Sequence, residues 1–135
     1  MYCLDTDVLS VLSKRAPPPP LIRRLGAIHP EEQCTTAINV AELLYGVSRS
    51  GHEGLEQRVR HAISRAGPVF PFDLRAAEVY GSLRARLESE GRRLDEPDLR
   101  IASIAIARDL TLVTGNIKHF SRVSELDLEN WLTDE

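Results

Sequence analysis

The residues best suited to chemistry in this sequence are acidic side chains placed where buried segments end. Asp5 directly follows the apolar stretch YCL in the opening segment MYCLDTDVLS. Glu42 lies near the start of a helix predicted from Asn39, and Asp98 lies in the first turn of a helix predicted before the strand TLVT. In an open parallel sheet, ligands bind beyond the carboxyl ends of the strands, where the next helices begin. If the helix of Asp98 starts at that edge, the sequence predicts that the three acids gather there.

Three carboxylates that meet in this way favour a bound cation. At ~4 Å and an effective dielectric constant near 20, each pair repels by about 4 kcal/mol. A divalent cation removes that repulsion. Oxygen ligands without a paired His or Cys favour a hard ion, Mg²⁺ or Mn²⁺, and such ions typically act on phosphate esters.

Each acid also has a structural explanation. Asp is a preferred residue immediately before a helix, so Asp7 and Asp73 are both predicted to be N-caps. Asp98 has a second explanation in the helix macrodipole, and Glu42 in a solvent-facing helix position. Asp5 is the hardest to explain structurally, because a strand that begins in the core seldom needs a charge at its end. The four histidines share no spacing and are predicted to be surface or packing residues.

Apolar periodicity and capping residues divide the chain into alternating strands and helices. Stretches rich in β-forming residues predict strands at 2–5, 33–36, 69–72 and 111–114, with a last short strand at 127–131. Helical periodicity predicts helices at 7–12, 21–25, 39–50, 55–66, 74–90 and 94–109. Gly51 and Gly91 are predicted to end two of them, and the prolines at 17–20 form a stiff connector.

This order of elements predicts the fold class α/β. Strands separated by helices pair in parallel, with helices on both faces. We therefore expect a three-layer domain with a central parallel sheet of four to five strands flanked by helices. At 135 residues and 15.1 kDa the chain has room for one core, so residues 1–135 are predicted to form a single domain.

Composition narrows the classes of function. The net charge of −3 gives no overall basic field, so a nucleic-acid partner would have to meet a local basic patch. Cys3 and Cys34 lie in apolar or β-branched stretches and are predicted to be small buried residues rather than zinc ligands. The N-terminus lacks a secretion signal and no apolar run reaches the length of a membrane span, which predicts a cytoplasmic protein without membrane contact.

Together, these segments resemble a PIN-domain ribonuclease of the VapC toxin family. The matching pieces are LDTDVLS, TAINVAELLYGV, VFPFD with AAEVYGSLRARLESEGRRL, PDLRIASIAIARDLTLVTGNIKHF and LENW. They occur in the family's order and cover nearly the whole chain. The resemblance implies one PIN domain over residues 1–135 and a Mg²⁺-dependent endoribonuclease that acts as the toxin of a toxin-antitoxin module.

The resemblance also assigns roles to individual residues. By position, the family's catalytic acids fall on Asp5, Glu42 and Asp98. Asp5 and Asp98 would hold Mg²⁺, for which Mn²⁺ is a possible substitute, and Glu42 would act directly or through water. Thr6 would help to position Asp5, and the hydroxyl of Thr114 would support the site.

Two positions depart from the family pattern. Asp7 replaces the Asn that is common after the dipeptide DT, which adds a negative charge near the pocket. Asn116 stands where many PIN domains carry a fourth acid, although other VapC-like chains have Asn there. We expect activity to survive, with a weaker second metal site and a resting state that holds one metal ion.

The family implies partners as well. A VapB-like antitoxin would lie across the groove and place a basic side chain in the acidic pocket, where an unpaired acidic cleft would attract an arginine. A homodimer, and a heterotetramer or larger assembly with the antitoxin, are expected. Basic residues near the expected mouth of the site are predicted to guide the RNA backbone, namely Arg75, Arg100, Lys118 and Lys14.

Two other functions fit parts of the sequence. The segment DTDV also matches the signature of haloacid-dehalogenase-like phosphatases, in which Asp5 would be the nucleophile. That enzyme class needs a later lysine and a pair of metal-binding acids, and TGN occupies the place of the acids. A non-catalytic PIN domain that only binds a partner or RNA is the second alternative, suggested by Asn116.

Overall fold

The computed structural model describes residues 1–134, which contain a five-stranded sheet in which each strand pairs in parallel with its neighbour. The strand order is β3-β2-β1-β4-β5. The strands are short: β1 (Tyr2–Leu4), β2 (Gln33–Thr36), β3 (Val69–Phe70), β4 (Thr111–Val113) and β5 (Asp127–Glu129). The predicted parallel α/β sheet is confirmed.

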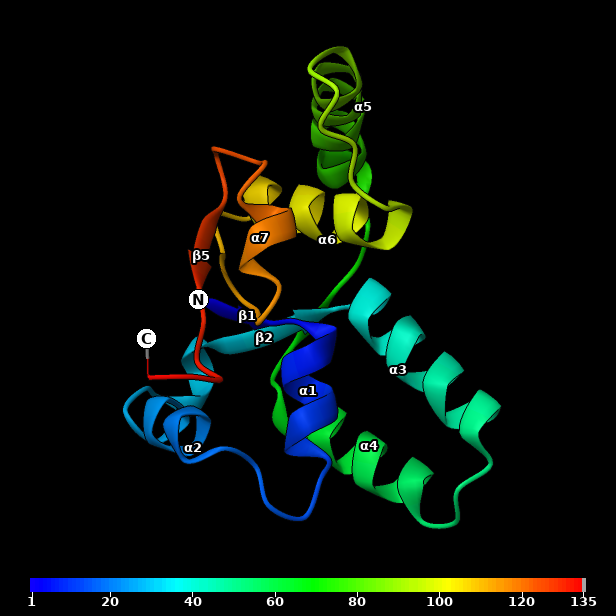
Figure 1. Ribbon diagram of the computed structural model, residues 1–135, viewed down its shortest axis with the longest axis vertical. Coiled ribbons are helices and arrows are strands. Elements are labelled where there is room, and N and C mark those ends of the chain that lie inside the picture. Colours follow the sequence, from blue (N-terminus) through cyan, green and yellow to red (C-terminus); the bar gives the residue numbers. More distant parts are fainter. Residues whose placement is uncertain (135) are drawn as a thin grey trace.

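Helices cover both faces of this sheet (Figure 1). On one side lie α1 (Thr6–Leu12), α2 (Pro19–Gly26), α3 (Ala37–Ser50) and α4 (Leu55–Arg65). On the other side lie α5 (Leu74–Ser89), α6 (Glu96–Ala107) and the short α7 (Ile117–Phe120). A 3-10 turn, Pro30–Glu32, precedes β2.

Strand residues alternate between two apolar cores, as the pleat of a strand requires. Cys3 and its register partner Cys34 point into the core beneath α5, α6 and α7. Leu4 and its partner Val113 point into the core formed with α1 to α4. Both cysteines are fully buried and free, as predicted. Within residues 1–134, the helices are too short or too polar to cross a membrane.

The boundaries predicted from local signals lie within two residues of the observed ones. β2 has the predicted bounds, Gly51 ends α3 in the left-handed conformation, and the Asp73 carboxylate accepts a hydrogen bond from the Ala76 backbone N–H at the start of α5. The second helix begins earlier than predicted, at Pro19, because proline is tolerated in the first turn of a helix. The strand at 69–72 ends at Phe70, and α7 was not predicted.

The prediction for Asp7 was wrong. The helix begins at Thr6 with Asp5 in the N-cap position, and Asp7 lies inside the first turn. Its carboxylate does not cap α1; it accepts a hydrogen bond from the Gly115 backbone N–H at 2.9 Å. A partner 108 positions away in the sequence cannot be inferred from local capping preferences.

The strand order locates the candidate site. The chain runs outward from β1 through β2 to β3, then returns to place β4 on the other side of β1. Ligands bind at such a reversal, beyond the carboxyl ends of the two diverging strands. Asp5 follows β1 and Thr114 follows β4, so both lie at this point.

Candidate active site

The predicted acids line one open pocket at the carboxyl edge of the sheet, with a volume of about 600 Å³. Asp5 comes from the end of β1, Glu42 from the second turn of α3, and Asp98 from the first turn of α6. The structure therefore brings together side chains that are far apart in the sequence. The lining residues are Asp5, Thr6, Asp7, Ser10, Glu42, Asp98, Gly115, Asn116 and Leu132.

Asp5 is the most buried of these acids, with 5% of its surface exposed. Its Oδ1 accepts a hydrogen bond from Asn39 Nδ2 at 2.9 Å, and its Oδ2 accepts one from Thr114 Oγ1 at 2.7 Å. Burial raises the pKa of Asp5, and the hydrogen bonds from Thr114, the Thr6 backbone and Asn39 oppose that rise. The carboxylate is therefore held in one orientation by the first turn of α3 and by the residue that follows β4.

Asn39 links two of the acids, and it was not among the residues predicted for the site. This side chain is fully buried, and its Nδ2 donates to both Asp5 Oδ1 and Thr6 Oγ1 at 2.9 Å. Thr6 Oγ1 in turn donates to Glu42 Oε1 at 2.7 Å. Asn39 lies three residues before Glu42, and this spacing puts both on one helix face, which is the signal that could have identified it.

Thr6 differs in detail from the expectation that it positions Asp5. Its hydroxyl contacts Glu42, and its connection to the Asp5 side chain runs through its backbone N–H and through Asn39. Thr114 donates directly to Asp5, and its Oγ1 also accepts from the Asn116 backbone N–H at 2.9 Å. The hydroxyl of Thr6 therefore orients the second acid rather than the first.

Negative charge accumulates in the pocket. Burial, followed by the charges of Asp5 and Glu42, raises the pKa of Asp98 to about 6. Burial and the charge of Asp5 likewise raise the pKa of Asp7 to about 6. Each shift means that the pocket disfavours another negative charge, and a bound cation would reverse that effect.

The donor set fits a hard divalent cation. The four acids offer oxygen atoms only, and Asp7 Oδ1 is buried without a hydrogen-bond partner among residues 1–134. In the same range, no three Asp, Glu, His or Cys side chains are grouped closely enough to enclose an ion. An ion such as Mg²⁺ needs no such cage, because it usually keeps several water ligands and binds through one or two carboxylates.

The basic residues expected at the mouth lie in different places. Arg75 is not at the site: it donates to the Ala107 carbonyl at 2.7 Å, at the opposite end of α6 from Asp98. Arg100 pairs with Glu96 at 3.1 Å and lies over the ring of Phe72. Lys118 is exposed on α7, and Lys14 lines a cavity beyond the end of α1.

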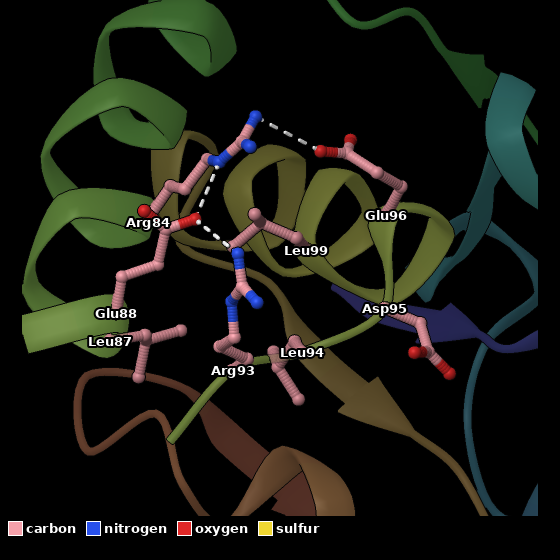
Figure 2. Close-up of a pocket in the computed structure, with 8 residues that line it drawn as sticks. All are labelled: Arg84, Leu87, Glu88, Arg93, Leu94, Asp95, Glu96 and Leu99. Carbon is pink, nitrogen blue, oxygen red and sulfur yellow. Dashed lines mark hydrogen bonds and ion pairs between the residues drawn. The ribbon is translucent and has the colours of Figure 1, made fainter. Parts of the chain in front are cut away.

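A second pocket, of about 320 Å³, lies between α5 and the start of α6 (Figure 2). Leu87, Leu94 and Leu99 form part of its lining. Its arginines are already paired: Arg84 with Glu88 at 3.0 Å and Glu96 at 3.2 Å, and Arg93 with Glu88 at 3.5 Å. Glu88 and Glu96 are thus paired with neighbouring arginines, unlike the acids around Asp5.

The parallel sheet and the acidic pocket at its reversal point define a PIN domain. The family model described as PIN domain matches residues 2–126, and the chain belongs to this family. The phosphatase alternative is therefore wrong, because the chain matches the PIN-domain family over residues 2–126.

Within the family, the chain groups with the VapC ribonucleases. It is 42% identical over 96 residues to Ribonuclease VapC2 of Rickettsia felis, covering 71% of this chain and 72% of that protein. It is 31% identical to the tRNA(fMet)-specific endonuclease VapC of Salmonella typhimurium, covering 96% and 97% of the two chains. A crystal structure of VapBC2 from Rickettsia felis bound to a promoter DNA fragment matches with a TM-score of 0.84 and 34% identity, covering 96% and 98%.

Proposed function

We propose that this protein is a metal-dependent endoribonuclease that hydrolyses RNA phosphodiester bonds and acts as the toxin of a VapBC-type toxin-antitoxin module. The observation on which this proposal depends is that Asp5, Glu42 and Asp98 line one pocket. Relatives named as ribonucleases share most of the chain's length. The proposed location is the cytoplasm, where the RNA substrates are.

The proposal gives each acid a task. Asp5 and Asp98 hold a divalent cation, and Glu42 takes a proton from the water that attacks phosphorus. When bound, the cation stabilises the negative charge that develops on the phosphate. Thr6 fixes Glu42 Oε1, which leaves Oε2 as the oxygen that accepts the proton.

Mg²⁺ is the proposed cation, with Mn²⁺ as a substitute. Both are hard ions that accept an all-oxygen donor set. Asn116 lines the pocket beside the acids, and we assign it and Thr114 to the support of the site and the positioning of substrate. The amide of Asn116 adds no charge, so one bound metal ion is the proposed resting state.

The proposed partner is a VapB-like antitoxin, with a homodimeric toxin and a heterotetramer or larger complex. A chain in each of two crystal structures of VapBC complexes resembles this chain over nearly its whole length. The acidic pocket would attract a basic side chain of the antitoxin, which would exclude both cation and RNA.

Cleavage of RNA by the purified chain tests the function. Wild-type protein with Mg²⁺ or Mn²⁺ should cleave total bacterial RNA at discrete new ends, and a chelator should abolish the cleavage. Asp98→Asn should lose at least about 100-fold in rate with an unchanged circular dichroism spectrum, since one cation ligand and its charge are lost. Asp127→Asn, an exposed acid on β5 outside the pocket, is the matched control.

The non-catalytic alternative makes the opposite prediction. Equal RNA binding by wild type and Asp98→Asn, with no cleavage in either metal, would show a binding module. Cleavage that persists in Asp98→Asn would place the reaction elsewhere in the molecule.

A further inference from the structure

The acidic pocket is one end of a longer groove along α1, α3 and α4. Three cavities, of about 600, 250 and 470 Å³, follow one another there and share lining residues. Ser10 lines all three, Thr6 and Glu42 join the first to the second, and Ser13 and Leu55 join the second to the third. We call this continuous depression the α1 groove.

The character of the α1 groove changes along its length. Beyond the acids, its middle section is lined by apolar groups from α3 and α4, including Leu43, Val47 and Val59, and by Gly46, which opens the space. Its far end is lined by Lys14, Arg15 and Arg58, with Glu53 as the one carboxylate among the residues lining that cavity within 1–134. The groove therefore runs from an acidic end to a basic end.

The basic end is available to a ligand. Lys14, Arg15 and Arg58 are exposed, and none of them forms an ion pair with another residue of the described part of the chain. By contrast, Arg84 and Arg100 are paired with glutamates. Unpaired cations at the end of a groove are suited to phosphate.

We propose that the α1 groove binds a single-stranded segment of the RNA substrate next to the cleaved bond, with a base in the apolar middle section and a phosphate at the basic end. This inference rests on the proposed ribonuclease function. α1 has seven residues and is therefore about 10 Å long, so the segment is short. The exposed Ser10 lies along the path, where hydroxyl groups commonly contact the sugar-phosphate backbone, whereas Ser13 is buried and its Oγ donates to the Ser10 carbonyl at 2.6 Å.

RNA matches the apolar middle section and the basic end of this groove. A nucleic acid strand alternates negative phosphates with flat apolar faces, as the middle and basic sections require. The scissile phosphate is negative, so it enters the acidic section only when a cation is bound there. The proposed reaction requires the same cation.

Blocking the middle section is the first test. At Gly46 an added Cβ meets no atom within 4 Å, and the same holds for Gly81 on α5, outside the groove. Gly46→Phe should fill the groove without disturbing the fold, and Gly81→Phe is its matched control. Both are helical positions where replacing glycine does not lower helix propensity, so both melting temperatures should equal or exceed that of the wild type.

Binding is measured with a 5′-fluorescein-labelled RNA of 12 random nucleotides, in the full-length chain carrying Asp98→Asn so that the RNA stays intact. Gly46→Phe should raise the Kd for this RNA at least about tenfold, in line with the loss of one stacked base. Gly81→Phe should stay within about twofold. A Kd equal to that of the control would overturn the inference.

Removing charge at the basic end is the second test and does not depend on the tolerance of Gly46. Arg15→Ala and Arg58→Ala should each raise the Kd for the RNA. Each should also reduce the slope of log Kd against log salt concentration by about 0.7. Arg65→Ala, an exposed arginine on the same helix as Arg58, should leave the slope unchanged. An equal effect of all three variants would show a diffuse field and would contradict the proposed phosphate site.

Two further outcomes separate this inference from the function on which it rests. If wild-type protein cleaves RNA and Gly46→Phe cleaves it equally well, the function stands and the groove inference fails. If Gly46→Phe blocks complex formation with the antitoxin but not RNA binding, the groove belongs to the protein partner and the inference also fails. Loss of RNA binding in Gly46→Phe supports it even where wild-type cleavage is not detected.

Discussion

Single side chains decide whether the acids of this pocket are ready to bind a cation. Asn39 is the residue on which most of the geometry depends, because its amide contacts Asp5 and Thr6 and its Oδ1 accepts from Thr36 Oγ1 at 2.7 Å. Its own backbone N–H donates to Thr36 Oγ1 at 3.2 Å. The amide thus fixes the start of α3 and the first acid together.

Asn39→Ala should weaken the site more than the fold. Removing the amide leaves buried partners unpaired, which costs about 1–3 kcal/mol of stability. Removing a group that orients a metal ligand typically lowers the metal affinity about 10–100-fold. Titration calorimetry with Mn²⁺ should therefore show a loss of affinity of that size in Asn39→Ala. Asn130→Ala, which removes the acceptor of a local turn bond to Leu132 N–H, is the control and should leave affinity unchanged. Equal Mn²⁺ affinity in both variants would contradict the positioning role.

The raised pKa values of Asp7 and Asp98, both about 6, predict how the metal-free protein responds to pH. Each folded pKa is above the usual value near 3.8, so the folded state holds these protons more tightly than the unfolded state. The free energy of unfolding should therefore fall as pH rises from about 4 through 6, by on the order of 2 kcal/mol for each group.

Urea unfolding in metal-free buffer at several pH values measures this effect. Asp98→Asn should flatten the fall between about pH 4 and about pH 6, because the amide does not titrate, and Mg²⁺ should stabilise wild type more at about pH 7.5 than at about pH 5. A pH profile that is the same in wild type and variant would contradict the electrostatic account.

At the scale of the element, the N-terminus of α5 shows how a cap side chain acts. The carboxylate of Asp73 accepts from the Ala76 backbone N–H at 3.1 Å, whereas Asp95 occupies the same position before α6 without a side-chain cap bond. Asp73→Ala should cost about 1 kcal/mol in chemical denaturation and Asp95→Ala clearly less. A larger loss for Asp95→Ala would show that the charge near the helix end matters more than the hydrogen bond.

The sequence predicted elements where the signal was local. Gly51 and Asp73 mark helix ends by their own conformational preferences, so these boundaries were correct. The helix predicted from Asn39 begins two residues earlier, at Ala37, where Thr36 is the N-cap. Asp7 resembled a cap by the same criterion, but its carboxylate bonds to Gly115 across the pocket. The four-residue α7 has too few residues to show periodicity, and it forms because Phe120 is buried in the core.

The site itself was also predictable where the signal was local. Strand ends and helix starts predict Asp5 and Glu42 at one edge of the sheet, and Asp98 as well if its helix starts there. Asn39 and the hydroxyl of Thr6 were missed or misassigned because their partners belong to other elements. The sequence therefore predicts which charged groups meet, but it does not predict the polar groups that orient them.

At the scale of the whole molecule, one sheet separates two apolar cores, and both are closed by residues from each half of the chain. Cys3 packs with α5, α6 and α7, while Trp131 near the C-terminus packs with α1 and α2. We therefore expect residues 1–135 to unfold as a single domain. Circular dichroism and tryptophan fluorescence should give coincident transitions, since Trp131 is the one tryptophan in the sequence. Two separate transitions would contradict the single-domain prediction.

The acidic pocket depends on this whole arrangement, because its lining comes from the ends of β1 and β4 and the starts of α3 and α6. A crystal of the protein soaked in Mn²⁺ and measured at the manganese absorption edge tests the central claim most directly. We predict an anomalous peak between the carboxylates of Asp5 and Asp98 that disappears in Asp98→Asn. Strong manganese peaks elsewhere, with none in this pocket, would contradict the account.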